Sequence, residues 1–280
     1  MEIRDLINKS YNNRIRIIEI MKKCGAAHVG GALSSIDILT VLYGKILKHN
    51  AKNPKWENRD IFLLSAAHKA IALYTVLQSE GYFDEKILWT YNQMGTQIPT
   101  HPNDKLPGIE FPLGSLGHGL SVAGGIALVL KREASNRKVY VLLGDGEMAE
   151  GSVWEAIMSS AKYKLDNLIA IIDVNGLQAE GYTKESMPIE PFEDKLASFG
   201  WKTMTIDGND IQQIYKALSS VPFRKDQPTC IIANTIKGKG MCFAESNIEY
   251  HNWTPDEKSC EEAIISIENN RKRELEKVEK

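Results

Sequence analysis

The chain of 280 residues has few cysteines, no long apolar run and almost no net charge, and each absence excludes a class of protein. Cys24, Cys230, Cys242 and Cys260 show no C-x-x-C spacing, so we expect reduced structural thiols in a cytoplasmic protein. A formal charge of −2 argues against a general binder of nucleic acids or anionic membranes. We also expect no secretory signal and no segment apolar for long enough to span a bilayer.

Two common phosphate-binding patterns are missing as well. The apolar run at 139–143 leads into Gly144-Asp145-Gly146, which lacks the third glycine of the dinucleotide-binding G-x-G-x-x-G pattern. The Lys-Gly-Lys-Gly segment at 237–240 does not match the Walker pattern either. Both negatives favour a diphosphate that is held through a metal ion.

What is present is an alternation of helical periodicity with short apolar segments typical of strands. Ser34 or Ser35 is expected to cap the second helix. The order predicts an α/β fold with a doubly wound, mostly parallel sheet, and residues 1–280 read as one domain because no boundary is visible. Helices are expected at 2–23, 36–47, 70–78, from 114–119 through 130, and at 153–163, 191–199 and 210–219, with a long loop at 92–115. Strands are expected at 60–65, 139–143, 168–173, 201–206 and 229–233.

Asp145 and Asn175 follow successive predicted strands, which are neighbours in most sheets. Their side chains should therefore lie together at the carboxyl rim, where ligands of open α/β sheets bind. A carboxylate, an amide oxygen and a backbone carbonyl are hard ligands suited to Mg²⁺ or Ca²⁺. Alternatively, Asp145 only caps the next helix and Asn175 only occupies a turn. The spacing leaves both interpretations open.

Five of the six histidines lie in expected loops or at helix starts, which suggests that they converge on a polar cleft. Neutral imidazoles in such a cleft could move protons and contact phosphate. For any one of them a surface or capping role is the alternative, and His49, at a helix end, is expected to have only a surface or helix-dipole role. The five histidines are His28, His68, His101, His118 and His251.

Four segments together resemble the transketolase family of thiamine diphosphate enzymes, and the resemblance covers nearly the whole chain. They are GSLGHGL at 114–120, GDGEMAEGSVWEA at 144–156, DNLIAIIDVNGLQ at 166–178 and IKGKG at 236–240. The resemblance is to the diphosphate-binding half only, because the pyrimidine-binding half with its ring-protonating glutamate has no counterpart here. It implies the thiamine-diphosphate-binding fold and the N-terminal subunit of a split transketolase. Such a subunit would need a separate C-terminal subunit, in a dimer of heterodimers.

The resemblance also implies a role for individual residues. Asp145, Asn175 and the backbone carbonyl of Leu177 would hold Mg²⁺ (or Ca²⁺ or Mn²⁺). Thiamine diphosphate would supply the carbanion equivalent that moves a two-carbon unit from a ketose to an aldose. The residues implied to contact sugar and move protons are His28, His68, His101 and His251. Those implied to border the cofactor are His68, Gly114, Leu116, His118, Gly144, Gly146, Glu147, Glu150, Asn175, Ala179 and His251, with Glu150 also in an acidic network between cofactor sites.

Three positions that precede histidines depart from the family pattern. Ala27, Ala67 and Thr100 stand where glycine is usual. We hypothesise a donor pocket reshaped for an unusual anionic ketose, such as a sulfonated sugar, with neutral backbone adjustment as the alternative. Two other functions stay open: a subunit of a 2-oxo acid decarboxylase or deoxyxylulose phosphate synthase, and a non-catalytic scaffold subunit.

Overall fold

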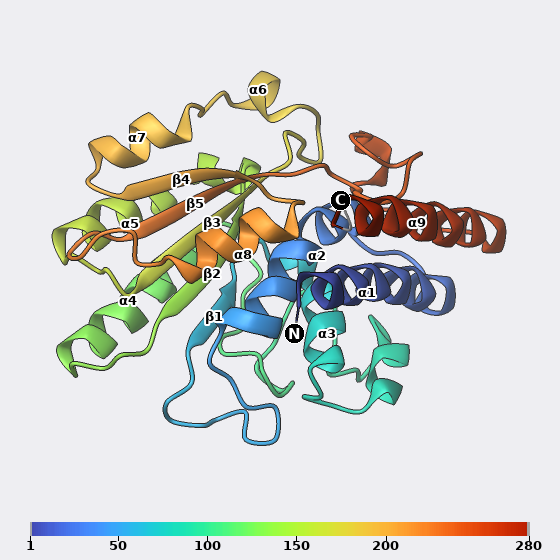
Figure 1. The fold of residues 1–280 in the computed structure, drawn as a ribbon, viewed down its shortest axis with the longest axis horizontal. Helices are drawn as coiled ribbons and strands as arrows, with labels where there is room; N and C mark the ends of the chain where they lie inside the picture. Colours follow the sequence, from blue (N-terminus) through green and yellow to red (C-terminus); the bar gives the residue numbers. More distant parts are fainter. Residues whose placement is uncertain (1, 279–280) are drawn as a thin grey trace.

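A five-stranded parallel sheet forms the centre of the computed structural model, which describes residues 2–278 (Figure 1). The strand order is β1-β2-β3-β5-β4, and every pair of neighbours is parallel, as the alternating pattern predicts. The strands are β1 (Ile61–Leu64), β2 (Val139–Gly144), β3 (Leu168–Val174), β4 (Lys202–Asp207) and β5 (Thr229–Asn234).

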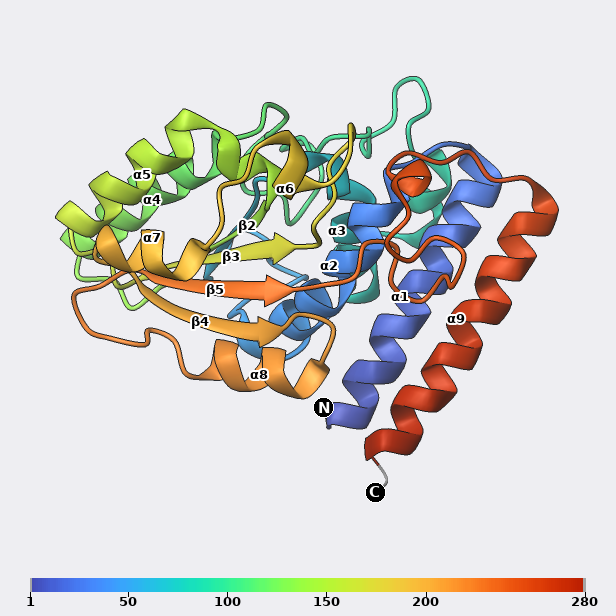
Figure 2. The same cartoon turned by 90° about the horizontal axis from the view of Figure 1, so that it is seen from above.

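Helices cover both faces of the sheet (Figure 2). Alternate strand side chains point to opposite faces, so Tyr140 and Leu142 join one apolar core while Val139 and Val141 join the other. Burial on both faces explains the continuous apolar strands. The first core includes α1 (Ile3–Cys24), α2 (Val29–Val41), α3 (Ala70–Ser79), α8 (Ile211–Ser219) and α9 (Glu257–Val278); the second includes α4 (Gly119–Arg132), α5 (Gly151–Lys162) and α7 (Phe192–Ser198).

Helix α2 is the most enclosed helix, because all 13 of its residues are buried. It begins at Val29, so the predicted cap at Ser34 or Ser35 is wrong; both hydroxyls lie inside the helix and donate to the Gly31 carbonyl. With the π-helical turn η1 (Leu42–Ile46) it makes Val29–Ile46 apolar and long enough to cross a membrane, contrary to our expectation. That stretch is 83% buried within the protein, as in a core helix.

The loops between the longer elements contain short helical turns that the periodicity did not predict. They are η2 (Ala67–Lys69), η3 (Glu85–Thr90), η4 (Gly146–Ala149), α6 (Thr183–Ser186) and η5 (Ile248–Tyr250). Segments of three to six residues are too short to show a helical repeat. Two of these turns, η2 and η4, follow β1 and β2 directly and change the direction of the chain at the rim where the site lies.

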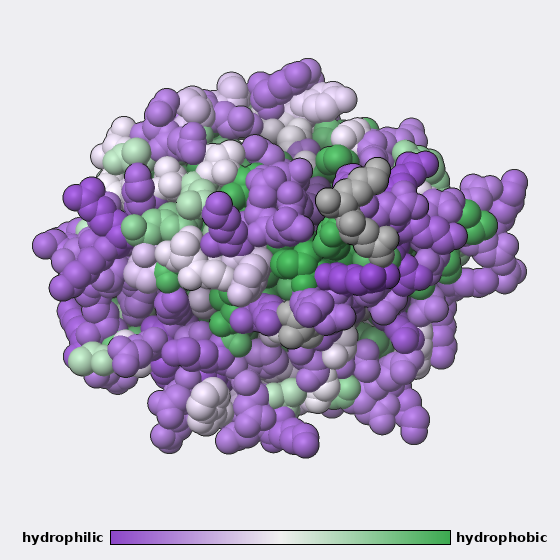
Figure 3. All heavy atoms as spheres, in the orientation of Figure 1, coloured by the Kyte–Doolittle hydropathy of each residue, from purple (hydrophilic) through white to green (hydrophobic). Residues whose placement is uncertain are grey.

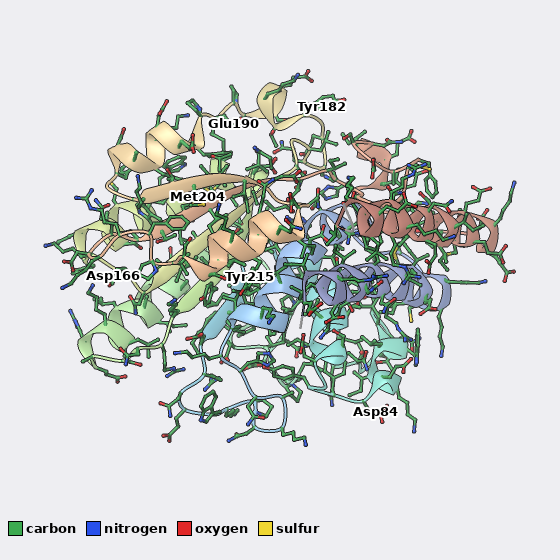
Figure 4. All side chains as sticks on the ribbon, viewed as in Figure 1. Asp84, Asp166, Tyr182, Glu190, Met204 and Tyr215 are labelled. Carbon is green, nitrogen blue, oxygen red and sulfur yellow. The ribbon has the colours of Figure 1, made fainter. Side chains whose placement is uncertain are left out.

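The outer surface in the orientation of Figure 1 is mostly hydrophilic (Figure 3). Helices α1 and α9 lie side by side (Figures 1 and 2). Exposed apolar side chains include Met204 on the edge strand β4 and Tyr182 beside α6, both labelled in Figure 4.

Candidate active site

Asp145 lies at the carboxyl end of β2, at the rim of the sheet. Its Oδ1 accepts the Gly146 N–H at 2.9 Å and its Oδ2 accepts the Gly176 N–H at 2.6 Å. The residue is 3% exposed, and burial, together with repulsion from Asp173, raises the pKa of the Asp145 carboxyl to about 6. Within residues 2–278 no basic side chain forms an ion pair with Asp145. A divalent cation would stabilise such a buried carboxylate.

Asn175 and Leu177 follow the neighbouring strand β3 and line the same cleft as Asp145. Asn175 Oδ1 accepts the Leu177 N–H at 3.2 Å, and the Leu177 carbonyl accepts a hydrogen bond from Lys237 Nζ at 2.9 Å. No cluster of three or more His, Cys, Asp or Glu side chains in the described chain could hold a metal. A metal site here would therefore depend on the oxygens of Asp145, Asn175 and Leu177, a set that suits a hard cation.

The structure brings four of the five predicted histidines together from four separate segments. The His28 ring centroid lies 5.5 Å from those of His68 and His251 and 6.4 Å from that of His101. The His68 and His251 rings lie 5.7 Å apart and nearly parallel, with an interplanar angle of 24°. All four rings line the cleft, whose volume is about 420 Å³, together with the predicted metal ligands.

Three of the four histidines in the cluster have a pKa below the ordinary value for histidine. Burial, reinforced by the neighbouring Lys69, lowers the pKa of His68 to about 2. Burial and Lys237 lower the pKa of His251 to about 4, and burial with His101 also lowers the pKa of His28. These three rings are therefore neutral at pH 7.

Inside that cluster, His28 has a ring nitrogen that the protein itself does not satisfy. Its Nδ1 is buried and has no hydrogen-bond partner among residues 2–278. Buried polar atoms are rarely left unpaired, so this nitrogen is available to a ligand.

The structure does not bring His118, which is predicted to lie next to the cofactor, into the cleft lining. His118 is exposed and lies outside the residues that line the cleft. It stands just before α4, where its Nδ1 contacts the Leu116 carbonyl at 3.1 Å. His49 also lies elsewhere: its Nε2 contacts the Tyr43 carbonyl at 2.8 Å and its ring stacks on Tyr82.

Glu147 lines the cleft, but the protein itself uses its carboxylate. This buried group accepts hydrogen bonds from the Ser65 hydroxyl and from the N–H groups of Gly117 (2.9 Å) and Gly144 (3.1 Å). It therefore joins three segments of the rim, which fits a structural role better than the predicted contact with the cofactor. The other predicted border residues in the lining are Gly114, Leu116, Gly144, Gly146, Glu150 and Ala179.

Two buried lysines in the cleft lining were missed by the sequence reasoning. Lys69 is 1% exposed and forms an ion pair with Asp173 at 2.5 Å. Lys237 is 2% exposed, and its Nζ lies 2.7 Å from His251 Nδ1. Fully buried lysines are rare, so composition gives no reason to expect them. The available signals were the place of Lys69 next to His68 and of Lys237 in the Lys-Gly-Lys-Gly segment. Gly31, Gln178 and Glu180 complete the lining.

A parallel α/β sheet with hard oxygen ligands on its rim and neutral imidazoles opposite them defines a ligand-binding site of the metal–diphosphate type. Residues 7–264 match the family described as "Transketolase, thiamine diphosphate binding domain". The chain belongs to the transketolase family.

Relatives of similar length are named as subunits. The chain is 38% identical to one subunit of the apulose-4-phosphate transketolase of Phocaeicola vulgatus, over 100% of this chain and 98% of that protein. It is 39% identical to the SqwG subunit of the 6-deoxy-6-sulfo-D-fructose transketolase of a Clostridium species, over 94% of this chain and 96% of the relative.

Solved transketolases share the fold but are longer. The crystal structure of the Campylobacter jejuni enzyme matches with a TM-score of 0.90 and 31% identity, over 95% of this chain and 43% of that one. The present chain thus spans less than half of that transketolase. These comparisons confirm the predicted family, the predicted fold, the transferase class and thiamine diphosphate as the cofactor.

Proposed function

We propose that this chain is the N-terminal, diphosphate-binding subunit of a two-chain transketolase that uses thiamine diphosphate and Mg²⁺. The observation that carries the proposal is one cleft that holds the oxygens of Asp145, Asn175 and Leu177 together with four histidine rings. The relatives named as subunits match over nearly their whole length, which supports a chain that is not the whole enzyme.

The residues present fit both the metal and the cofactor. Thiamine diphosphate, when bound, supplies the carbanion equivalent for ketol transfer. Asp145, Asn175 and Leu177 would hold the cation that neutralises its diphosphate, and an all-oxygen set favours Mg²⁺. The raised pKa of Asp145 fits this role, because a bound cation would offset the cost of burying the carboxylate.

The histidines differ in what they can do for a sugar substrate. An imidazole with a pKa of about 2, as for His68, is a weak base and suits hydrogen bonding to a hydroxyl better than proton uptake. His28 has an unpaired Nδ1 that can form a hydrogen bond with a hydroxyl. We infer that the cluster orients the sugar hydroxyls and holds protons at defined ring nitrogens.

The missing half of the active site belongs, in this proposal, to a C-terminal partner subunit that binds the pyrimidine ring. Glu150 supports this, because it lines the cleft and is exposed, and its carboxylate has no hydrogen-bond partner within residues 2–278. Two such pairs would form a dimer of heterodimers. Four free cysteines fit a reducing, cytoplasmic setting.

We further propose an anionic ketose donor, phosphorylated or sulfonated. The relatives named above are called transketolases of a sugar phosphate and of a sulfonated sugar, at nearly equal identity. Of the three departures from the family pattern, Thr100 has a side chain that contacts a histidine: its Oγ1 lies 3.1 Å from His101 Nδ1. Ala27 forms a backbone bridge to Trp253, and Ala67 lies in the core.

The test is an assay of the chain together with its partner subunit against phosphorylated ketoses, a sulfonated ketose and pyruvate. We expect two-carbon transfer from an anionic ketose, dependent on thiamine diphosphate and Mg²⁺. Turnover of pyruvate alone would favour the decarboxylase or synthase alternative. A complex that binds no cofactor and turns over none of these substrates would favour the scaffold alternative.

A further inference from the structure

Two adjacent glycines at the start of α2 make room for the two buried lysines. A Cβ added to Gly30 would lie 2.9 Å from Lys237 Cγ and 3.1 Å from its Cε. A Cβ added to Gly31 would lie 3.1 Å from Lys69 Cε and 3.3 Å from its Cγ. Each lysine stem therefore runs along its own glycine into the lining of the cleft.

The two ammonium groups end in different surroundings. Lys69 Nζ contacts the Asp173 carboxylate, so its charge is neutralised within the protein. Lys237 has no carboxylate within ion-pair distance in the part of the chain that is described, and it instead contacts the Leu177 carbonyl and His251 Nδ1. Burying an ammonium group without a carboxylate partner costs desolvation free energy. We therefore expect the contacts of Lys237 to have a functional reason.

The backbone around Lys237 is held as firmly as its side chain. The next residue, Gly238, donates its N–H to the Gly30 carbonyl at 3.0 Å, and the Lys237 carbonyl accepts the Ser246 N–H at 2.9 Å. The position of Nζ is therefore set by the glycine slot and by these two backbone contacts together.

We propose that Lys237 is a positioning residue that fixes His251 as the tautomer with its proton on Nε2 and ties that ring to the Leu177 carbonyl. An ammonium group has three donors and no acceptor, so the Nδ1 that faces it must accept. A neutral imidazole that accepts at Nδ1 carries its hydrogen on Nε2. The hydrogen of His251 would thus be presented at Nε2, while the same ammonium holds a carbonyl assigned to the metal.

Lys237 would thus connect the two parts of the site, because it contacts both the His251 ring and the Leu177 carbonyl. Its catalytic consequence depends on the proposed function, but the tautomer itself does not. The contact geometry and the charge on Lys237 predict a single tautomer in the chain without substrate, so the two claims can fail separately.

The test is histidine-selective ¹⁵N NMR of the full chain at neutral pH, with His251 assigned from the spectrum of His251→Gln. We expect widely separated Nδ1 and Nε2 shifts for His251 in the wild type, as for one dominant tautomer. In Lys237→Met we expect these shifts to move together as both tautomers become populated. Lys69→Met is the matched control, because it removes the other buried ammonium and should leave the His251 shifts separated.

A chemical rescue guards against a folding defect in Lys237→Met. Lys237→Cys treated with 2-bromoethylamine regains an ammonium at nearly the original reach, with the wild type treated in the same way as control because Cys242 is also exposed. We expect the separated shifts to return. In the two-chain enzyme, kcat/KM for the donor should fall at least tenfold in Lys237→Met and recover on alkylation. Unchanged His251 shifts in Lys237→Met, or His251 shifts that move together in Lys69→Met, would overturn the proposal.

Discussion

The two halves of the cleft are built in different ways. Asp145 and Asn175 follow neighbouring strands, and backbone N–H groups from the same turns hold their oxygens. The four-histidine cluster instead gathers rings from four segments spread along the chain, with few protein contacts for the ring nitrogens. The carboxylate half is thus preformed by local structure, whereas the imidazole half depends on long-range packing and leaves polar atoms for a ligand.

The largest effect should come from breaking the carboxylate half. In the two-chain complex, Asp145→Asn should weaken Mg²⁺-dependent thiamine diphosphate binding at least about 100-fold, because a charged ligand of the metal is lost. Isothermal titration with the cofactor measures this. Asp166→Asn is the matched control, since Asp166 precedes β3 and pairs with Lys131, outside the cleft. Undiminished cofactor affinity in Asp145→Asn would defeat the metal assignment.

The second effect concerns what holds that half together. Glu147→Gln should lower the free energy of unfolding by about 2 to 3 kcal/mol, because an amide cannot accept from three donors as a carboxylate does. Urea denaturation of the isolated chain measures the loss. Glu150→Gln, at an exposed carboxylate, should change it by less than about 0.5 kcal/mol. Equal losses in both variants would show that the Glu147 contacts add no stability.

The imidazole half should make the free energy of unfolding depend on pH. His68 has a folded pKa of about 2, far below its ordinary value, so only the unfolded chain takes up its proton as the pH falls below about 6.5. Its contribution to stability is therefore complete above that pH and declines at lower pH. Between pH 7 and 5 the stability difference between wild type and His68→Gln should shift against the wild type by about 1 to 2 kcal/mol. A difference that is constant over this range would mean that His68 is not buried in its neutral form.

The smallest effect is expected at His118, the predicted site histidine that lies outside the cluster. His118→Gln should change the free energy of unfolding by less than about 0.5 kcal/mol, because its ring is exposed and contacts only the Leu116 carbonyl of its own loop. Cofactor affinity of the complex should stay within about threefold of the wild type, in contrast to Asp145→Asn. A larger loss, measured by the same titration, would return His118 to the cofactor site.

The carboxylate half of the site could be predicted from the sequence better than the imidazole half, because local structure forms the first and long-range packing forms the second. Strand periodicity and the parallel topology were enough to place Asp145 next to Asn175, because β2 and β3 pair directly. The histidines could be collected only by type and loop position, a criterion that cannot show which way a ring points, and so it included His118. Lys237 was not predicted because no local pattern reports burial of a charge.

Prediction of the fold from the sequence is limited in a similar way. The strands and long helices follow from periodicity, but the start of α2 does not, since two glycines normally indicate a loop. Here Gly30 and Gly31 lie inside the first helical turn, where a Cβ on Gly30 would meet the Tyr250 carbonyl and the Lys237 stem and a Cβ on Gly31 would crowd the Lys69 stem. Only the packed structure contains that reason.

The complete burial of α2 has a consequence for hydrogen exchange. All of its residues are buried and it packs against α1, α3 and α8, so its amides should exchange only when the whole chain unfolds. Because His28 directly precedes this helix, a ligand that binds the cluster docks at the end of the slowest-exchanging segment. Protection of the α2 amides should therefore report ligand binding as a change in global stability, whereas the rim loops would report it as local ordering.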